Sequence, residues 1–144
     1  MKIEIMEKKH AHAVAEIASQ SLAEAWSEDA FKKETENPSA TIFVALLGDD
    51  VIGFGGVQTV LDEAYITNIA VKKEYRRKGA GEALLKAIIN SCTDLSFVTL
   101  EVRVSNSAAI KLYEKQGFVS QGIRKNFYSH PTEDANIMTL FLGE

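Results

Sequence analysis

The arrangement of apolar and polar residues predicts an ordered series of strands and helices. Apolar residues that alternate with polar ones, or form short β-rich runs, favour strands, and apolar residues three or four positions apart favour helices. We therefore expect strands at residues 3–6, 41–47, 51–61, 63–71, 97–102, 118–123 and 135–142. Helices are expected at residues 13–22, 27–37, 81–91 and 105–117.

Polar residues and glycines indicate where several of these elements begin and end. Ser27, followed by two acidic residues, is typical of a helix N-cap. Asn106 and its serine neighbours offer a second N-cap, and Gly117 is a typical helix stop. Gly48 and the two aspartates after it separate two apolar runs, which predicts a hairpin.

The order of the elements predicts the class of fold. A helix between the strands at residues 63–71 and 97–102 is typical of a right-handed βαβ crossover, whereas the other strands suit antiparallel pairing. We therefore expect an α/β chain of the α+β type. It should have a mixed, mostly antiparallel sheet of about seven strands with helices on both faces.

Composition and length suggest one ordinary globular domain over residues 1–144. The chain is 46% hydrophobic and 25% charged, without a repeat or a linker-like stretch at which a domain boundary would lie. No apolar run has the length of a membrane span or a signal peptide, so we expect a cytoplasmic protein without a membrane partner. The formal net charge of −4 argues against a nucleic-acid binder held by bulk electrostatics.

The sequence offers little for a disulfide or a metal. A single cysteine, Cys92, excludes an internal disulfide and a cysteine-rich zinc site. His10 and His12 lack ligand geometry with a third partner. We therefore expect no metal.

The most informative segment is residues 68–85, where a basic, glycine-bearing turn joins a predicted strand to a predicted helix. The first turn of a helix leaves amide N–H groups without partners and carries partial positive charge, so it attracts anions. Gly79 and Gly81 permit left-handed angles and close backbone approach, and the basic residues 76–78 add charge. The spacing fits neither a P-loop nor a dinucleotide fingerprint. Phosphate binding is one interpretation, and a solvated basic turn is the other.

Two motifs together resemble the GNAT superfamily of acetyl-CoA-dependent N-acetyltransferases. Residues 68–85 are similar to its pyrophosphate-binding segment, and residues 106–118 resemble its signature Asn-x-x-Ala-x-x-Leu-Tyr-x-x-x-Gly-Phe. The similarity covers nearly the whole chain and implies the GNAT fold. Within the superfamily, Trp26-Ser27, residues 61–64 and residues 100–103 look most like the ribosomal-protein-alanine N-acetyltransferase subfamily, called RimI. Arg124 and Tyr128 also fit that subfamily.

One stretch departs from the subfamily pattern. Its members usually carry His and Pro shortly before the Trp-Ser pair, whereas residues 21–25 of this chain contain neither. The departure concerns the shape of the pocket for the acceptor, whose walls we expect near residues 26–31, 60–65 and 124–128.

The resemblance implies a set of residues for acetyl-CoA. The pantetheine arm should pair with one strand, and the pyrophosphate should lie on the turn that follows it. The implied cofactor-binding residues are Ile69, Ala70 and Val71 on the strand, Arg76, Arg77, Lys78, Gly79, Ala80, Gly81 and Glu82 on the turn and helix, and Asn106. The backbone N–H of Val71 is also placed to polarise the thioester carbonyl.

The resemblance also implies that Glu101 is the proton acceptor and Tyr113 the proton donor. An ordinary glutamate is a weak base for an amine, so we expect Glu101 to act through a water molecule or to be made more basic by burial. Without the resemblance, Tyr113 would be interpreted as a core tyrosine, and Glu101 as equally suited to a solvent-facing position.

Several functions remain open at this level. The first is acetylation of the N-terminal α-amine, expected to be alanine, of a ribosomal small-subunit protein with a basic tail. At a given pH a neutral α-amine is about 3.5 kcal/mol easier to obtain than a neutral lysine amine. Alternatives are other protein N-termini or lysines, a small-molecule amine, and a non-enzymatic acetyl-CoA sensor. We expect a monomer or weak dimer without direct nucleic-acid contact.

Overall fold

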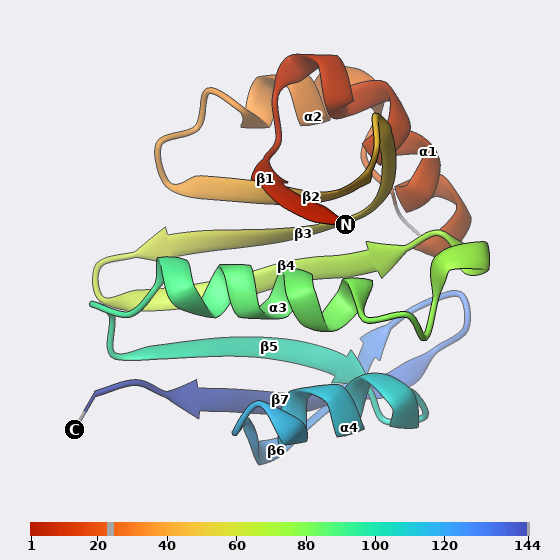
Figure 1. Ribbon diagram of the computed structural model, residues 1–144. Helices are drawn as coiled ribbons and strands as arrows, with labels where there is room; N and C mark the ends of the chain where they lie inside the picture. Colours follow the sequence, from red (N-terminus) through yellow and green to blue (C-terminus); the bar gives the residue numbers. More distant parts are fainter. Residues whose placement is uncertain (23–24, 144) are drawn as a thin grey trace.

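Seven strands form a single sheet in the order β1-β2-β3-β4-β5-β7-β6 (Figure 1). The computed structural model describes residues 1–22 and 25–143. Neighbouring strands are antiparallel except for β4 and β5, which run parallel, so the predicted mixed, mostly antiparallel sheet is confirmed. The strands are β1 (Lys2–Ile5), β2 (Ala40–Leu47), β3 (Asp50–Val60), β4 (Glu63–Val71), β5 (Phe97–Arg103), β6 (Val119–Tyr128) and β7 (Glu133–Phe141).

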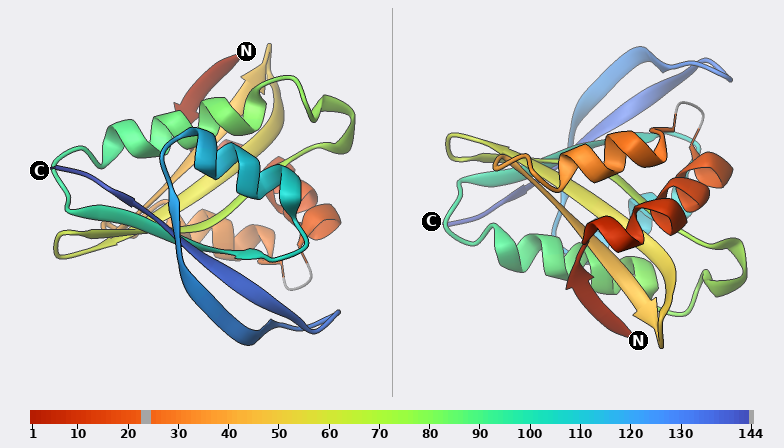
Figure 2. Two further views of the ribbon diagram at one scale, coloured as in Figure 1. Left: turned by 90° about the horizontal axis from the view of Figure 1, so that it is seen from below. Right: turned by 90° about the horizontal axis from the view of Figure 1, so that it is seen from above.

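The helices cover both faces of this sheet, as expected. Helices α1 and α2 lie on one face, and α3 and α4 lie on the other (Figure 2). They are α1 (Ala11–Ser21), α2 (Glu28–Glu34), α3 (Ala80–Ser91) and α4 (Ser107–Lys115), and the sequence did not predict the short 3-10 turns η1 (Lys8–His10) and η2 (Lys73–Tyr75). Ala23 and Glu24, part of the stretch that departs from the subfamily pattern, lie outside the described residues.

The predicted helix caps are present. The Ser27 Oγ accepts a hydrogen bond from the Ala30 N–H at 3.2 Å, and the Asn106 Oδ1 accepts one from the Ala109 N–H at 3.2 Å. Gly117 follows α4 with a φ of 100°, a left-handed angle that favours glycine. Both helices therefore begin where their sequences predict.

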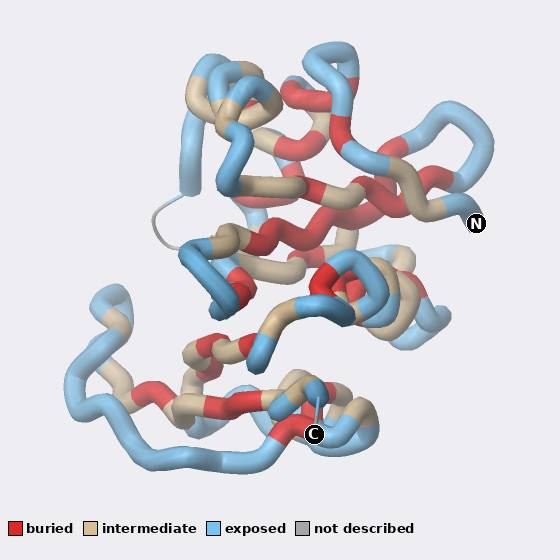
Figure 3. The backbone as a smooth tube through the Cα atoms, turned by 90° about the vertical axis from the view of Figure 1, so that its left-hand side faces the viewer, coloured by how far each residue is buried: buried red, intermediate tan, exposed pale blue. Residues whose placement is uncertain are grey.

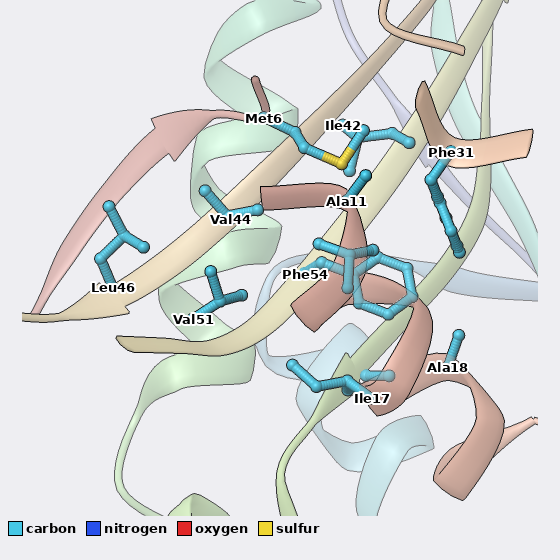
Figure 4. Packing of buried hydrophobic residues seen from close by; sticks show 12 residues of the cluster. Met6, Ala11, Ile17, Ala18, Phe31, Ile42, Val44, Leu46, Val51 and Phe54 are labelled. Carbon is cyan, nitrogen blue, oxygen red and sulfur yellow. The ribbon is translucent and has the colours of Figure 1, made fainter. Parts of the chain in front are cut away.

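Two apolar layers hold the helices on the sheet. On one face Phe31 of α2 meets Phe54 of β3 edge-on, with 5.6 Å between ring centroids, and α1 completes the layer (Figure 4). On the other face Leu85 and Ile88 of α3 pack with residues from β5 and β7. Buried residues follow the middle of the sheet, whereas much of the β6–β7 hairpin is exposed (Figure 3). Ile89 of α3 is only partly buried.

A bulge in β4 changes which way its side chains point. Asn68 pairs with Gly56 and Ile66 pairs with Val57, so Thr67 is an extra residue in β4. Ile66 belongs to the apolar layer under α3, whereas Ala70 belongs to the layer under α1. Without the extra residue, both would face the same side of the sheet. After the bulge, the side chains of β4 therefore point to the opposite faces of the sheet from those that the alternation before the bulge would give.

We predict that Gly56→Ala lowers the free energy of unfolding by about 1–3 kcal/mol, because the added methyl group requires other atoms to move. A Cβ at Gly56 would lie 2.7 Å from the Thr67 Oγ1. Denaturant unfolding measures the loss. Thr67→Ala removes the obstructing hydroxyl, so the double variant should lose less stability than the two single variants added together. Strictly additive losses would contradict the contact.

Candidate active site

Strands β4 and β5 separate after a short paired stretch. They pair from Glu63 with Phe97 to Tyr65 with Thr99, whereas β4 continues to Val71 and β5 to Arg103. Over that remaining length β4 stays paired with β3, and β5 stays paired with β7. Each strand therefore turns one unpaired edge toward the wedge between them, and Figure 1 shows them diverging. Unpaired strand edges offer backbone N–H and C=O groups to a ligand.

The wedge edge of β4 carries Ile69, Ala70 and Val71. The N–H of Lys72 donates to the Ile52 carbonyl of β3 at 2.8 Å. Neighbouring residues of a strand direct their backbone groups to opposite sides, so the N–H of Val71 points toward the wedge. The Val71 carbonyl accepts a hydrogen bond from the Arg76 Nε at 3.0 Å.

The turn after β4 ends at a helix terminus without a side-chain cap. Gly79 is the N-cap residue of α3, with a φ of 90°, and no side chain of the described residues caps this helix. The first helical hydrogen bond runs from the Ala83 N–H to the Gly79 carbonyl at 3.0 Å. The N–H groups of residues 80–82 therefore have no helix carbonyl to bond, in contrast to the capped starts of α2 and α4.

The second glycine of this turn behaves differently from the sequence expectation. Gly81 is an ordinary residue of α3, and a Cβ there would lie 3.7 Å from the Leu112 Cδ2. Arg77 instead takes the other left-handed angle, with a φ of 64°. The expectation of left-handed angles holds for Gly79 and is wrong for Gly81.

The charged residues of the turn point in different directions. Residues 76–78 are all exposed, but the Arg76 guanidinium folds back toward Val71 and lies 3.5 Å from the Ser21 Oγ. The Lys78 ammonium lies 5.9 Å from the centroid of the Tyr75 ring.

Glu82, in the first turn of α3, forms ion pairs with two lysines. Lys115 and Lys86 each lie 3.2 Å from its carboxylate. The hydrogen bond from Lys115, followed by that from Lys86, lowers the pKa of the Glu82 carboxyl. Its side chain therefore links α3 to α4.

Glu101 lies on β5 with its carboxylate held from two sides. Its side chain is 10% exposed, the Tyr65 hydroxyl donates to Oε1, and the Arg124 Nη1 donates to Oε2 at 3.0 Å. Burial, and then the hydrogen bond to Glu101, raises the pKa of Tyr65. The phenol therefore stays protonated and remains a donor. Sequence reasoning gave Tyr65 and Arg124 no contact with Glu101, although their positions on strands near β5 were a signal.

Tyr113 lies on the face of the sheet that α3 and α4 cover. It is 8% exposed, belongs to the apolar layer under α3 and α4, and packs against Phe118 with 5.6 Å between ring centroids. Burial raises the pKa of Tyr113 to about 12. Its hydroxyl forms no hydrogen bond with the part of the chain that the structure describes. Glu101 and Tyr113 therefore lie on opposite faces of the sheet, and no hydrogen bond joins them within the described residues.

Asn106 uses its side-chain oxygen within the protein, because Oδ1 caps α4. Its amide nitrogen is not used by that contact. The same turn is tied to the β6–β7 hairpin by Glu133, whose Oε1 lies 3.1 Å from the Arg103 Nη1 and whose Oε2 accepts from the Ser105 N–H at 2.8 Å. These contacts fix the hairpin beside the carboxyl end of β5.

Two hollows meet at the β4 bulge, and both are lined by Thr67 and Asn68. The larger, of about 720 Å³, lies between the end of α1 and the β6–β7 hairpin and includes Tyr128. The smaller, of about 240 Å³, lies under α2 and includes Trp26 and Tyr65. Parts of all three segments expected to form the acceptor pocket therefore line these hollows.

Two further properties concern the described residues as a whole. Within residues 1–22 and 25–143, no cluster of His, Cys, Asp and Glu side chains is arranged to hold a metal ion. Over the same ranges, every helix is too short or too polar to span a bilayer.

Comparison with known proteins gives consistent matches over most of the chain. Residues 11–118 match the Acetyltransferase (GNAT) family. A Bacillus subtilis (strain 168) protein, provisionally named a [ribosomal protein bS18]-alanine N-acetyltransferase, is 42% identical over 134 residues, which cover 91% of this chain and 89% of the relative. The [ribosomal protein bS18]-alanine N-acetyltransferase of Escherichia coli (strain K12) is 42% identical over 121 residues, covering 80% of each chain.

Solved structures agree with these sequence matches. The crystal structure of the ribosomal-protein-S18-alanine N-acetyltransferase from Escherichia coli superposes with a TM-score of 0.89 at 36% identity, covering 99% of this chain and 94% of the other. Ard1 from Thermoplasma volcanium gives a TM-score of 0.86 at 30% identity, covering 99% and 98%. The expected GNAT fold and the resemblance to the ribosomal-protein-alanine N-acetyltransferases are confirmed. The chain therefore belongs to the GNAT family and is an acetyl-CoA-dependent N-acetyltransferase.

Proposed function

We propose that this enzyme transfers the acetyl group of acetyl-CoA to the N-terminal α-amine, normally alanine, of a ribosomal small-subunit protein. The main support is that three features lie around the wedge between β4 and β5. They are the N-terminus of α3, which no described side chain caps, the unpaired edge of β4, and the Glu101 carboxylate, which Tyr65 and Arg124 hold in place. The relatives named for bS18-alanine acetylation support the acceptor. Residues 1–144 act as one catalytic domain, and the enzyme works in the cytoplasm as a monomer or weak dimer.

Acetyl-CoA supplies the acetyl group as a reactive thioester, and the residues around the wedge fit such a molecule. The backbone groups of Ile69 and the N–H of Val71, which face the wedge, orient the pantetheine arm as an added strand would, with Ala70 between them. The free N–H groups of residues 80–82, with Arg77 and Lys78, bind the pyrophosphate. Arg76 holds the turn at the edge of this site, and Asn106 contributes its amide nitrogen. The Val71 N–H is directed toward the carbonyl that reacts.

Glu101 and Tyr113 move protons on either side of the wedge. Glu101 accepts the proton that the attacking amine loses, directly or through a water molecule, while Arg124 and Tyr65 keep its carboxylate in place. Tyr113 delivers a proton to the departing sulfur. Its raised pKa keeps the hydroxyl protonated at neutral pH, so this proton is available.

The acceptor side suits the end of a basic polypeptide. Exposed residues of the β6–β7 hairpin line the hollow of about 720 Å³, which leaves a path for a chain that continues beyond the amine. The net charge of −4 favours encounter with a basic partner. An α-amine is also the easier nucleophile, by about 3.5 kcal/mol relative to lysine at a given pH.

We predict turnover with peptides that begin with alanine and much less with a blocked peptide containing an internal lysine. Thiol release from acetyl-CoA should be measured with matched peptides beginning in Ala, Ser or Met, the blocked peptide, and a panel of small amines. The free α-amine is neutral in a larger fraction at neutral pH, which favours the first group. Turnover confined to lysine or small amines would overturn the α-amine proposal.

We predict that Gly79→Ala raises the KM for acetyl-CoA about tenfold and leaves the KM for the peptide nearly unchanged. The residue has a φ of 90° and open space around it, so an added methyl group disturbs the backbone angle of the turn without a clash. Gly48→Ala is the matched control, because Gly48 also has a left-handed φ, 64°, and open space but lies in the β2–β3 hairpin. Equal effects from both variants would argue against a phosphate site at Gly79.

We predict that Tyr113→Phe lowers kcat by about 10²-fold or more without changing the shape of the rate profile between about pH 6 and 10. Burial raises the pKa of Tyr113 to about 12, so the phenol does not titrate in this range. Glu101→Gln should also lower kcat, and it should alter the pH dependence itself because the base is lost. An unchanged profile for Glu101→Gln would remove Glu101 from the proton-accepting role.

A further inference from the structure

The hollow under α2 has the chemistry of a site for one charged side chain. Its volume of about 240 Å³ is small, and is below the range of about 300–1,000 Å³ typical of small-molecule sites. The aromatic residues Trp26, Phe31 and Tyr65 supply part of its wall, and Glu34 supplies a carboxylate. Aromatic faces and a carboxylate together suit a cation with an apolar stem.

Glu34, the last residue of α2, has no cationic partner among the residues that the structure describes. Its oxygens accept two long hydrogen bonds, from the Asn37 Nδ2 at 3.3 Å and the Gln58 Nε2 at 3.4 Å. Both exceed the usual length of about 2.9–3.0 Å and come from neutral amides, so a charged donor can replace them. The carboxylate is therefore held in place but not neutralised.

The neighbouring glutamates show that this state is particular to Glu34. Glu28 of the same helix pairs with Lys32 at 3.2 Å and with the His12 ring at 2.8 Å. Glu36, two residues beyond Glu34, pairs with Lys8. Glu34 alone of these three faces the hollow, and it alone lacks an ion pair within the described segment.

The hollow is connected to Glu101 through a single side chain. Tyr65 lines the hollow, and its hydroxyl donates to the Glu101 carboxylate on β5. One phenol ring therefore separates the base from the hollow. An extended peptide advances about 3.3–3.6 Å per residue. The length of the Tyr65 ring between Glu101 and the hollow therefore corresponds to about two residues beyond the reacting amine.

We propose that the hollow binds a lysine or arginine at the second or third residue of the acceptor, and that Glu34 determines this preference. The cation displaces the long amide contacts of Glu34, while its aliphatic stem lies against Trp26 and Tyr65. This inference rests on the proposed peptide acceptor and adds a specificity residue outside the proton-transfer pair.

The test compares kcat/KM for matched peptides that begin with alanine and carry Arg, Lys, Gln or Glu at the second or third position. The wild-type enzyme should prefer the cationic peptides over the Gln peptide by about tenfold. Glu34→Gln should abolish this preference, with its main loss on the cationic peptides. Glu34→Lys should favour the Glu peptide. Thermal unfolding of each variant shows that it is folded.

Glu36→Gln is the matched control, because it removes one negative charge from the same segment without touching the hollow. It should keep the wild-type preference. If peptides are acetylated without a charge preference, or if Glu34→Gln and Glu36→Gln behave alike, this inference is overturned and the α-amine acceptor stands. If no peptide is acetylated, both proposals fail.

Discussion

The separation of β4 from β5 after Tyr65 and Thr99 is the constraint on which the rest of the site depends. A continuous sheet would satisfy both strand edges and leave no backbone groups for a ligand. Here β4 stays hydrogen-bonded to β3, and β5 stays hydrogen-bonded to β7. The facing edges of β4 and β5 are therefore unpaired, while the hydrogen bonds between the other strands are kept. Glu101 lies on the strand that forms one side of the wedge, and Tyr113 lies under α4 on the opposite face of the sheet.

The bulge at Thr67 and the hairpin after β6 adapt the fold around that wedge. Because of the bulge, Thr67 and Asn68 line both hollows. Gly56 has no side chain, so the extra residue Thr67 can lie close to its backbone. The Glu133 carboxylate ties the hairpin to Arg103 at the end of β5. Arg124 of the same hairpin reaches the Glu101 carboxylate. The acceptor side is thus built by distant segments that the wedge brings together.

Features that depend on neighbouring residues were predictable from the sequence. The Ser27 and Asn106 caps, the β2–β3 hairpin and the bounds of β4 follow from local hydrogen bonding, turn chemistry and period-two patterning. The left-handed φ of Gly79 was also predictable, because it depends on the glycine itself and its position just before α3. The angle expected at Gly81 was wrong because α3 already begins at Ala80, so Gly81 takes the backbone angles of the helix.

By itself, the sequence determined the order of strands and helices and the family resemblance. It also determined the candidates Glu101, Tyr113 and residues 76–82. The reason is that motifs and periodicity depend on residues that are close together in the chain. Only the tertiary structure decided what those candidates touch. Tyr65 lies 36 positions before Glu101, and Arg124 lies 23 after it. Their contacts with Glu101 are set by strand order and register, since Tyr65 pairs with Thr99 of β5 and Arg124 lies on β6, beyond β7. Glu34 has no ion pair within the described residues because the fold places no lysine or arginine of that part of the chain within ion-pairing distance of it, and no local sequence pattern predicts this.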